Sequence, residues 1–150
     1  MTKEIDVYAL TPPPRPAAFH PLQAILLGFP LPLFVGTLLS DLAYWRTAQI
    51  QWANFAQWLN AAGLLAAGLA MLALLVALIR DRGTARGRAA LIGGLIWLPA
   101  WGTGLMNALV HARDAWGAMP DALWWSAVSV LLALLATWAG YGGFTSPEAP

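Results

Sequence analysis

The chain has 150 residues, enough for one domain; 59% are hydrophobic and only 10% are charged, whereas soluble domains average about 45–50% and about 25%. So few charges cannot cover the surface of a soluble globular protein. The net charge of +1 and the absence of cysteine argue against a nucleic-acid-binding surface and against disulfide, zinc–thiolate or iron–sulfur chemistry. We therefore predict that the chain lies in a membrane.

Charged residues divide the chain into four long uncharged segments, at residues 16–40, 47–79, 89–112 and 122–147. Each is longer than the roughly 20 residues that cross a bilayer as a helix. Stretches such as Leu64–Leu78 lack the alternation of barrel strands. We predict an all-α, four-helix transmembrane bundle with up-down connectivity and short loops. Its helices are expected near Pro21–Tyr44, Trp52–Ile79, Arg88–Ala112 and Pro120–Gly140.

Local signals support these helices. Pro21 after His20 suits the first helical position, because proline has no amide to leave unpaired there. Asp121 suits the positive end of the last helix dipole. Prolines within the first and third helices predict bends, at Pro30, Pro32 and Pro99.

Three segments are expected along the chain. Residues 1–19, which contain four prolines in a short stretch, form an extended cytoplasmic tail. Residues 20–143 form the four-span domain, and residues 144–150 form a short C-terminal tail. No positive region precedes a short apolar run with a cleavage site, so we expect no cleaved signal peptide.

The distribution of lysine and arginine predicts the orientation. With four spans, one side collects six cations and the other side collects only Arg46 and Arg113. We therefore expect a bacterial inner-membrane protein with both termini in the cytoplasm. A site for a lipid headgroup or another anion is the second interpretation of the four arginines in the loop. The six cations are Lys3, Arg15, Arg80, Arg82, Arg86 and Arg88.

Most of the tryptophans fall near the two membrane boundaries, where indole rings are favoured. Trp97 and Trp101 differ, because they lie one turn apart near the middle of the third helix. They are interpreted either as core packing or as a platform beside a flat cofactor.

Polar residues gather in the outer half of the predicted bundle. Thr103, Asn107 and His111 form one stripe on the third helix. The other helices place further polar groups at the same depth, among them Asp41, Gln57 and Asn60. We predict a shared polar cavity open to the periplasm and centred on His111 and Asp41, with simple interhelical hydrogen bonds as the alternative. Beside the polar stripe lies a small-residue stripe of Ala100, Gly104 and Ala108, which favours close helix approach.

The His111–Asp41 pair has three interpretations: a proton relay, a site for a quinone carbonyl, or a structural salt bridge. Haem b is also considered, with His20, His111, Trp97 and Trp101 as cofactor-binding candidates. His20 and His111 are expected on opposite sides of the membrane. One haem would therefore need a second protomer, another ligand type or a different topology.

Short motifs resemble a known family. His20-Pro21, Phe29-Pro30 and Asp41-Leu42, together with the run 107–116, are similar to motifs of the bacterial membrane family called domain of unknown function 2231. The resemblance covers roughly residues 20–140. It implies a four-span inner-membrane protein without a settled activity, and it points to His20, Pro21, Pro30, Asp41, Asn107 and His111 as the residues to test.

Three functions remain open. The first is an accessory or anchor subunit that docks a periplasmic or membrane partner through the small-residue stripe or the outer loops. The second is an electron-transfer subunit with haem b or quinone, and the third is a small-molecule transporter. A homodimer is an open possibility, and no nucleic acid or metal is expected. No nucleophile–base motif or phosphate loop is present in the sequence, so we expect no independent catalytic activity.

Overall fold

The computed structural model describes residues 21–113 and 115–142. These residues form six helices: α1 (Pro21–Gly28), α2 (Pro30–Thr47), α3 (Ile50–Arg80), α4 (Ala85–His111), α5 (Ala115–Ala118) and α6 (Asp121–Gly142). Among the described residues, four segments are long and apolar enough to cross a membrane. They are Ile25–Thr47, Ile50–Arg80, Ala85–His111 and Asp121–Ala139. The predicted four-helix transmembrane bundle is therefore confirmed.

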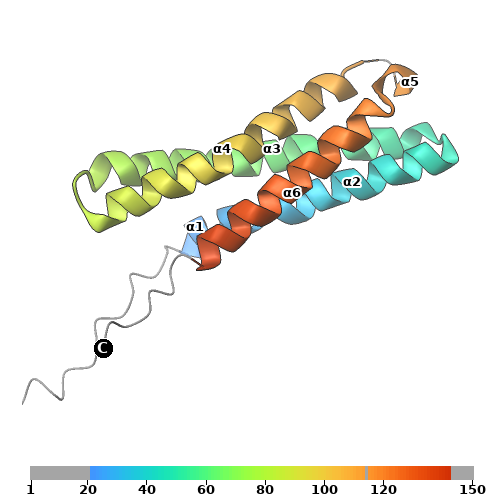
Figure 1. Ribbon diagram of the computed structural model, residues 1–150. Coiled ribbons are helices and arrows are strands. Elements are labelled where there is room, and N and C mark those ends of the chain that lie inside the picture. Colours follow the sequence, from blue (N-terminus) through green and yellow to red (C-terminus); the bar gives the residue numbers. More distant parts are fainter. Residues whose placement is uncertain (1–20, 114, 143–150) are drawn as a thin grey trace, which may run out of the picture.

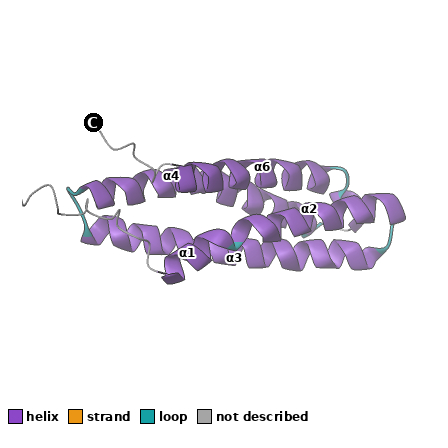
Figure 2. Ribbon diagram, turned by 90° about the horizontal axis from the view of Figure 1, so that it is seen from below, coloured by secondary structure: helices purple, strands orange, loops and turns teal. Residues whose placement is uncertain are grey.

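The four long helices pack in a ring, with α2 against α3, α3 against α4, α4 against α6 and α6 against α2. From α2 to α6, each of the four long helices runs opposite to the one before it (Figure 1). The α3–α4 connection, α1 and the last turn of α6 lie at one end of the bundle, which we call the arginine end. The α2–α3 connection and α5 lie at the other, which we call the α5 end (Figures 1 and 2).

The first span runs as one helical segment from Ile25 to Thr47, and its regular pattern is interrupted only at Phe29, next to Pro30, where a bend was predicted. α1 ends at Gly28, and α2 begins at Pro30. Proline suits the start of a helix because its missing amide would have no intrahelical partner there. Pro99, in contrast, leaves α4 continuous from Ala85 to His111.

The connection at the arginine end is tightly fixed. The Thr84 hydroxyl caps α4 by accepting a hydrogen bond of 3.2 Å from the Gly87 amide, and it donates one of 2.7 Å to the Asp81 carbonyl. A Cβ atom on Gly87 would lie 2.3 Å from the Asp81 carbonyl oxygen. Glycine is therefore required where the chain turns back into α4.

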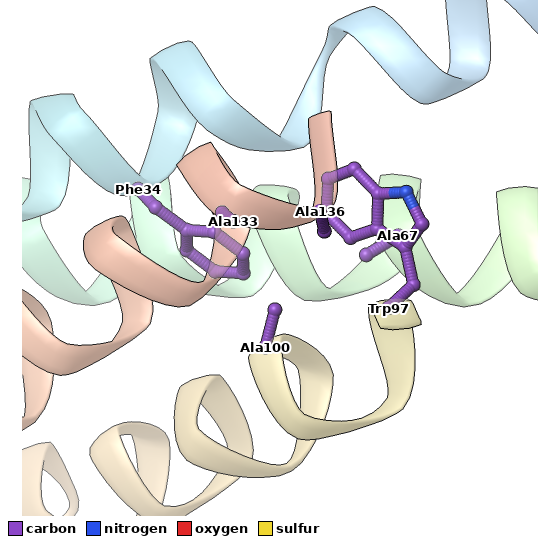
Figure 3. Packing of buried hydrophobic residues seen from close by; sticks show 6 residues of the cluster. All are labelled: Phe34, Ala67, Trp97, Ala100, Ala133 and Ala136. Atoms are coloured by element: carbon purple, nitrogen blue, oxygen red, sulfur yellow. The ribbon is translucent and has the colours of Figure 1, made fainter. Parts of the chain in front are cut away.

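The bundle buries small residues and exposes large ones. Alanines fill the interior at Ala67, Ala100, Ala133 and Ala136, where they surround the rings of Phe34 and Trp97 (Figure 3). Long leucines point outward, and Leu65 and Leu131 are 66% and 56% exposed. This inverted arrangement is expected in lipid, where helices associate by close packing and not by the hydrophobic effect.

Candidate functional site

The polar interior of the bundle lies toward the α5 end. Eight polar or charged side chains are buried among the described residues: Thr37, Ser40, Asp41, Asn60, Asn107, His111, Ser126 and Ser129. All except Thr37, which lies just before the midpoint of α2, come from the halves of α2, α3, α4 and α6 nearest to that end. On α2, α4 and α6 they recur at spacings of three or four residues, which places them on one face of each helix. The sequence predicted that polar groups of different helices lie at a common depth, and in the structure several of them are in contact.

Asp41 and His111 form a direct pair across the bundle. His111 Nε2 lies 2.8 Å from Asp41 Oδ1, and the two side chains are 4% and 0% exposed. The other ring nitrogen, Nδ1, lies 2.9 Å from the backbone carbonyl oxygen of Asn107. Both nitrogens of the imidazole are therefore engaged.

These contacts determine how many protons the pair holds. A carbonyl oxygen can only accept a hydrogen bond, so His111 Nδ1 must carry a hydrogen. The Nε2–Oδ1 contact then needs one more proton, held either by the imidazole, as an ion pair, or by the carboxyl group, as a neutral pair. In both cases the pair has no net charge, and this lowers the cost of burying it.

Ser126 and Asn107 extend the pair to a third helix. The Ser126 hydroxyl donates to Asp41 Oδ2 and accepts a hydrogen bond of 2.8 Å from Asn107 Nδ2. The hydroxyl group thus donates one hydrogen bond and accepts another. We call Asp41, His111, Ser126 and Asn107 the tetrad. It links α2, α4 and α6 in one hydrogen-bonded network.

Three further buried polar atoms have no hydrogen-bond partner among the described residues: Asn60 Oδ1, Asn107 Oδ1 and Ser129 Oγ. Asn60 does use its amide group, which donates a hydrogen bond of 3.1 Å to the Gly104 carbonyl. Ser129 lies one helical turn beyond Ser126 on α6, on the side of the apolar interior. Buried polar groups are nearly always satisfied, so these three atoms are exceptions within the described part of the bundle.

Besides Asn60, two further predicted site residues lie outside the tetrad. Thr103 bonds within its own helix, where its hydroxyl lies 3.0 Å from the carbonyl oxygens of Pro99 and Ala100. The side chain of Gln57 is exposed, and its amide donates a hydrogen bond of 3.1 Å to the backbone carbonyl of His111. Gln57 therefore satisfies the last carbonyl of α4, which has no partner within the helix.

Among the described residues, Trp97 and Trp101 are not brought together with His111. Trp97 packs among alanines in the apolar interior, and fourteen residues of helix, about 21 Å, separate it from His111. Trp101 donates its indole N–H to the Leu64 carbonyl at 3.2 Å. His20 lies outside the described residues.

The small-residue stripe faces into the bundle, so it cannot be the external docking surface that we considered. Ala100 is fully buried. A Cβ atom on Gly104 would lie 3.1 Å from atoms of both Leu64 and Phe34, while Ala108 is half-buried. These small residues allow α4 to pack closely against neighbouring helices of the same chain.

The tetrad itself is hydrogen-bonded, and Asp41 is completely buried. The polar cavity open to the periplasm stays a prediction. Ser126 is the member that our list of site residues omitted. Its depth on the fourth span was visible in the sequence, but nothing there distinguished it from Ser129.

The comparison with protein families agrees with this architecture. Residues 19–145 match the model of a family described as predicted membrane protein (DUF2231). No curated protein and no solved structure matches the chain. The family match includes all four spans and the whole tetrad. The chain therefore belongs to the DUF2231 family of predicted membrane proteins.

Proposed function

We propose that the chain is an accessory subunit of the bacterial inner membrane that holds one exchangeable proton at the Asp41–His111 pair, near the periplasmic face. The observation that carries this proposal is the 2.8 Å contact between His111 Nε2 and Asp41 Oδ1, made while Nδ1 faces a carbonyl oxygen. Ionisable groups within membrane spans are costly and mark functional sites.

The surrounding residues favour access from one side only. His111 is the last residue of α4, and Asp41 lies within about 10 Å of the end of α2. On the other side of the tetrad the interior is filled by Phe34, Trp97 and alanines. A proton therefore has a shorter route toward the α5 end, past the small apolar cluster of Val110, Ala118 and Ala122, than toward the arginine end. This arrangement favours a one-sided site over a transporter.

The chemistry of His111 disfavours the haem alternative. An imidazole binds iron through a nitrogen lone pair, but Nδ1 carries a hydrogen and Nε2 is engaged with Asp41. Haem ligation would require the pair to be broken. No contact among the described residues favours quinone binding in its place.

The proposed accessory role rests on the short connections at residues 48–49 and 81–84. They leave no room between these spans for a separate catalytic domain. If the chain acts with a partner, purified protein in vesicles should not move protons across the membrane faster than protein-free vesicles do. Rapid proton flux that His111→Ala abolishes would favour the transporter instead.

The proton site can be tested by nuclear magnetic resonance of ¹⁵N-labelled histidine in the full chain. There are two histidines, so His20→Gln assigns the signals. We expect Nδ1 to be protonated throughout a pH titration, and the Nε2 signal to change once as one proton is exchanged. A His111 ring with a bare Nδ1, or one that keeps a single state throughout the titration, would overturn the proposal.

The proposed orientation has its own test. It rests on the six cations expected on one side of the membrane against two on the other, and four of the six lie in or beside the α3–α4 connection. A reporter enzyme that is active only in the periplasm, fused after Arg82, should show no activity. Strong activity would place the arginine end outside and the tetrad near the cytoplasm.

A further inference from the structure

An apolar groove of about 450 Å³ runs along the outside of the bundle between α3 and α4. On α3 it extends from Gly68 to Leu78, and on α4 from Ala90 to Trp101. At a rise of about 1.5 Å per residue, each wall is about 15 Å long. This is half of the roughly 30 Å hydrocarbon core of a bilayer, the depth of one leaflet.

Small residues create this groove. A Cβ atom added to Gly94 would meet no atom within 4 Å, so the groove is open at this position. Trp101 closes the deep end, where its indole is held by the Leu64 carbonyl. Leucines form the walls, and Leu75 and Leu95 are 50% and 58% exposed. The lining suits a hydrocarbon chain.

The open end of the groove reaches the arginine end of the bundle. Arg88 lies one helical turn before Leu91, a groove residue, and therefore on the same face of α4. The segment 80–88 holds four arginines and one aspartate, a net charge of +3. Asp81 approaches Arg86 only to 3.9 Å, and that arginine remains 63% exposed. The groove thus ends beside a cluster of positive charge at the level of the lipid headgroups.

We propose that this groove binds one anionic phospholipid of the leaflet at the arginine end, with an acyl chain between α3 and α4 and the phosphate beside Arg88. The apolar length of the groove matches one leaflet, and the charge at its mouth has the sign that attracts anionic headgroups. This inference is independent of the tetrad, which lies near the opposite end of the bundle.

The test is native mass spectrometry of the full chain in mild detergent, with phosphatidylglycerol or phosphatidylcholine of the same acyl chains added at equal concentration. We expect one tightly held phosphatidylglycerol and a clear preference over phosphatidylcholine. Arg88→Gln should lower this preference about fivefold, the effect of about 1 kcal/mol per cation near an anionic surface. Arg46→Gln, at the α5 end, is the matched control and should leave the preference unchanged.

A second pair of variants tests the acyl-chain part of the site. Gly94→Leu fills the groove and should reduce the binding of both lipids, while Gly102→Leu, also on α4 and without a neighbour within 4 Å, should not. Equal retention of the two lipids by the wild type, or wild-type retention by Gly94→Leu, would overturn the proposal. Displacement of the lipid by soluble glycerol phosphate would also overturn it, because the site would then recognise a free phosphate ester. If Gly94→Leu does not fold, the arginine variants decide alone.

Discussion

The two halves of the bundle interior use opposite chemistry on the same helices. Toward the α5 end, Asp41, His111, Ser126 and Asn107 are joined by hydrogen bonds across three helices. Toward the arginine end, Trp97 and Phe34 lie against alanines. In lipid, apolar packing gains little from exclusion of water, so the apolar half depends on close fit. The polar half depends on each group keeping its partner, because hydrocarbon offers no substitute.

Asp41 should be the most sensitive position in the polar half. Asp41→Ala leaves His111 Nε2 and the Ser126 hydroxyl without their shared partner. Removing one member of a buried pair costs about 3 kcal/mol or more. The free energy of unfolding, measured in detergent with increasing dodecyl sulfate, should fall by about this amount.

Asp41→Asn is the matched control for this prediction. An asparagine can donate from its amide to a neutral His111 and accept from Ser126, so the net charge and both contacts are retained. We expect a loss below about 1 kcal/mol for this variant. Equal losses for the alanine and asparagine variants would show that the pair carries a net charge or that its geometry is different.

Trp97 plays the corresponding role in the apolar half. Trp97→Ala should create a cavity among Ala67, Ala100 and Ala136. Such a change costs about 3–5 kcal/mol in soluble proteins. Because lipid removes much of the transfer term, we expect about 2 kcal/mol here. Trp138→Ala, at a position 78% exposed, should change unfolding little. A comparable loss for both tryptophans would contradict the assignment of Trp97 to the interior.

The sequence contained enough information for the spans and for the pairing of Asp41 with His111. Span length follows from the spacing of charges, and the depth of a residue follows from its distance to the helix end. Two polar residues at equal depth on inward faces have few other partners in a bundle. These quantities do not depend on which helices are neighbours.

Other features depend on which helices are neighbours, and the sequence alone did not determine them. The stripe of Ala100 and Gly104 indicated close approach, but sequence could not tell whether the approaching helix came from the same chain. The polar groups predicted an open cavity, whereas side-chain packing determines whether such groups enclose space or fill it. Ser126 joined the tetrad and Thr103 bonded to its own helix because rotation of each helix selects which hydroxyl faces Asp41.

Gly104 lies between the two halves and tests how tightly they are joined. Its substitution by alanine places a Cβ atom 3.1 Å from Leu64 and Phe34, so these side chains must shift. Overpacking of this kind costs typically 1–3 kcal/mol, and one methyl group should fall at the lower limit, about 1 kcal/mol. Gly102→Ala meets no atom within 4 Å and should be neutral or slightly stabilising. The same unfolding measurement compares the two variants. If Gly102→Ala were destabilised and Gly104→Ala were unaffected, the face of α4 that carries Gly102 would be the packed one.

We expect the smallest loss of stability when an exposed ion pair on the surface is broken. Arg113 and Asp121 approach to 3.4 Å at the α5 end, and both side chains are 57% exposed. Water screens such pairs, so Arg113→Ala should lower the free energy of unfolding by less than about 0.5 kcal/mol, and added salt should remove even that difference.

The Asp41–His111 pair has a shorter contact of 2.8 Å and is buried, so its contribution should persist in high salt. Unfolding of Asp41→Ala and Arg113→Ala at low and high ionic strength thus compares two acid–base pairs at one end of the bundle. Equal sensitivity to salt would mean that water reaches the tetrad.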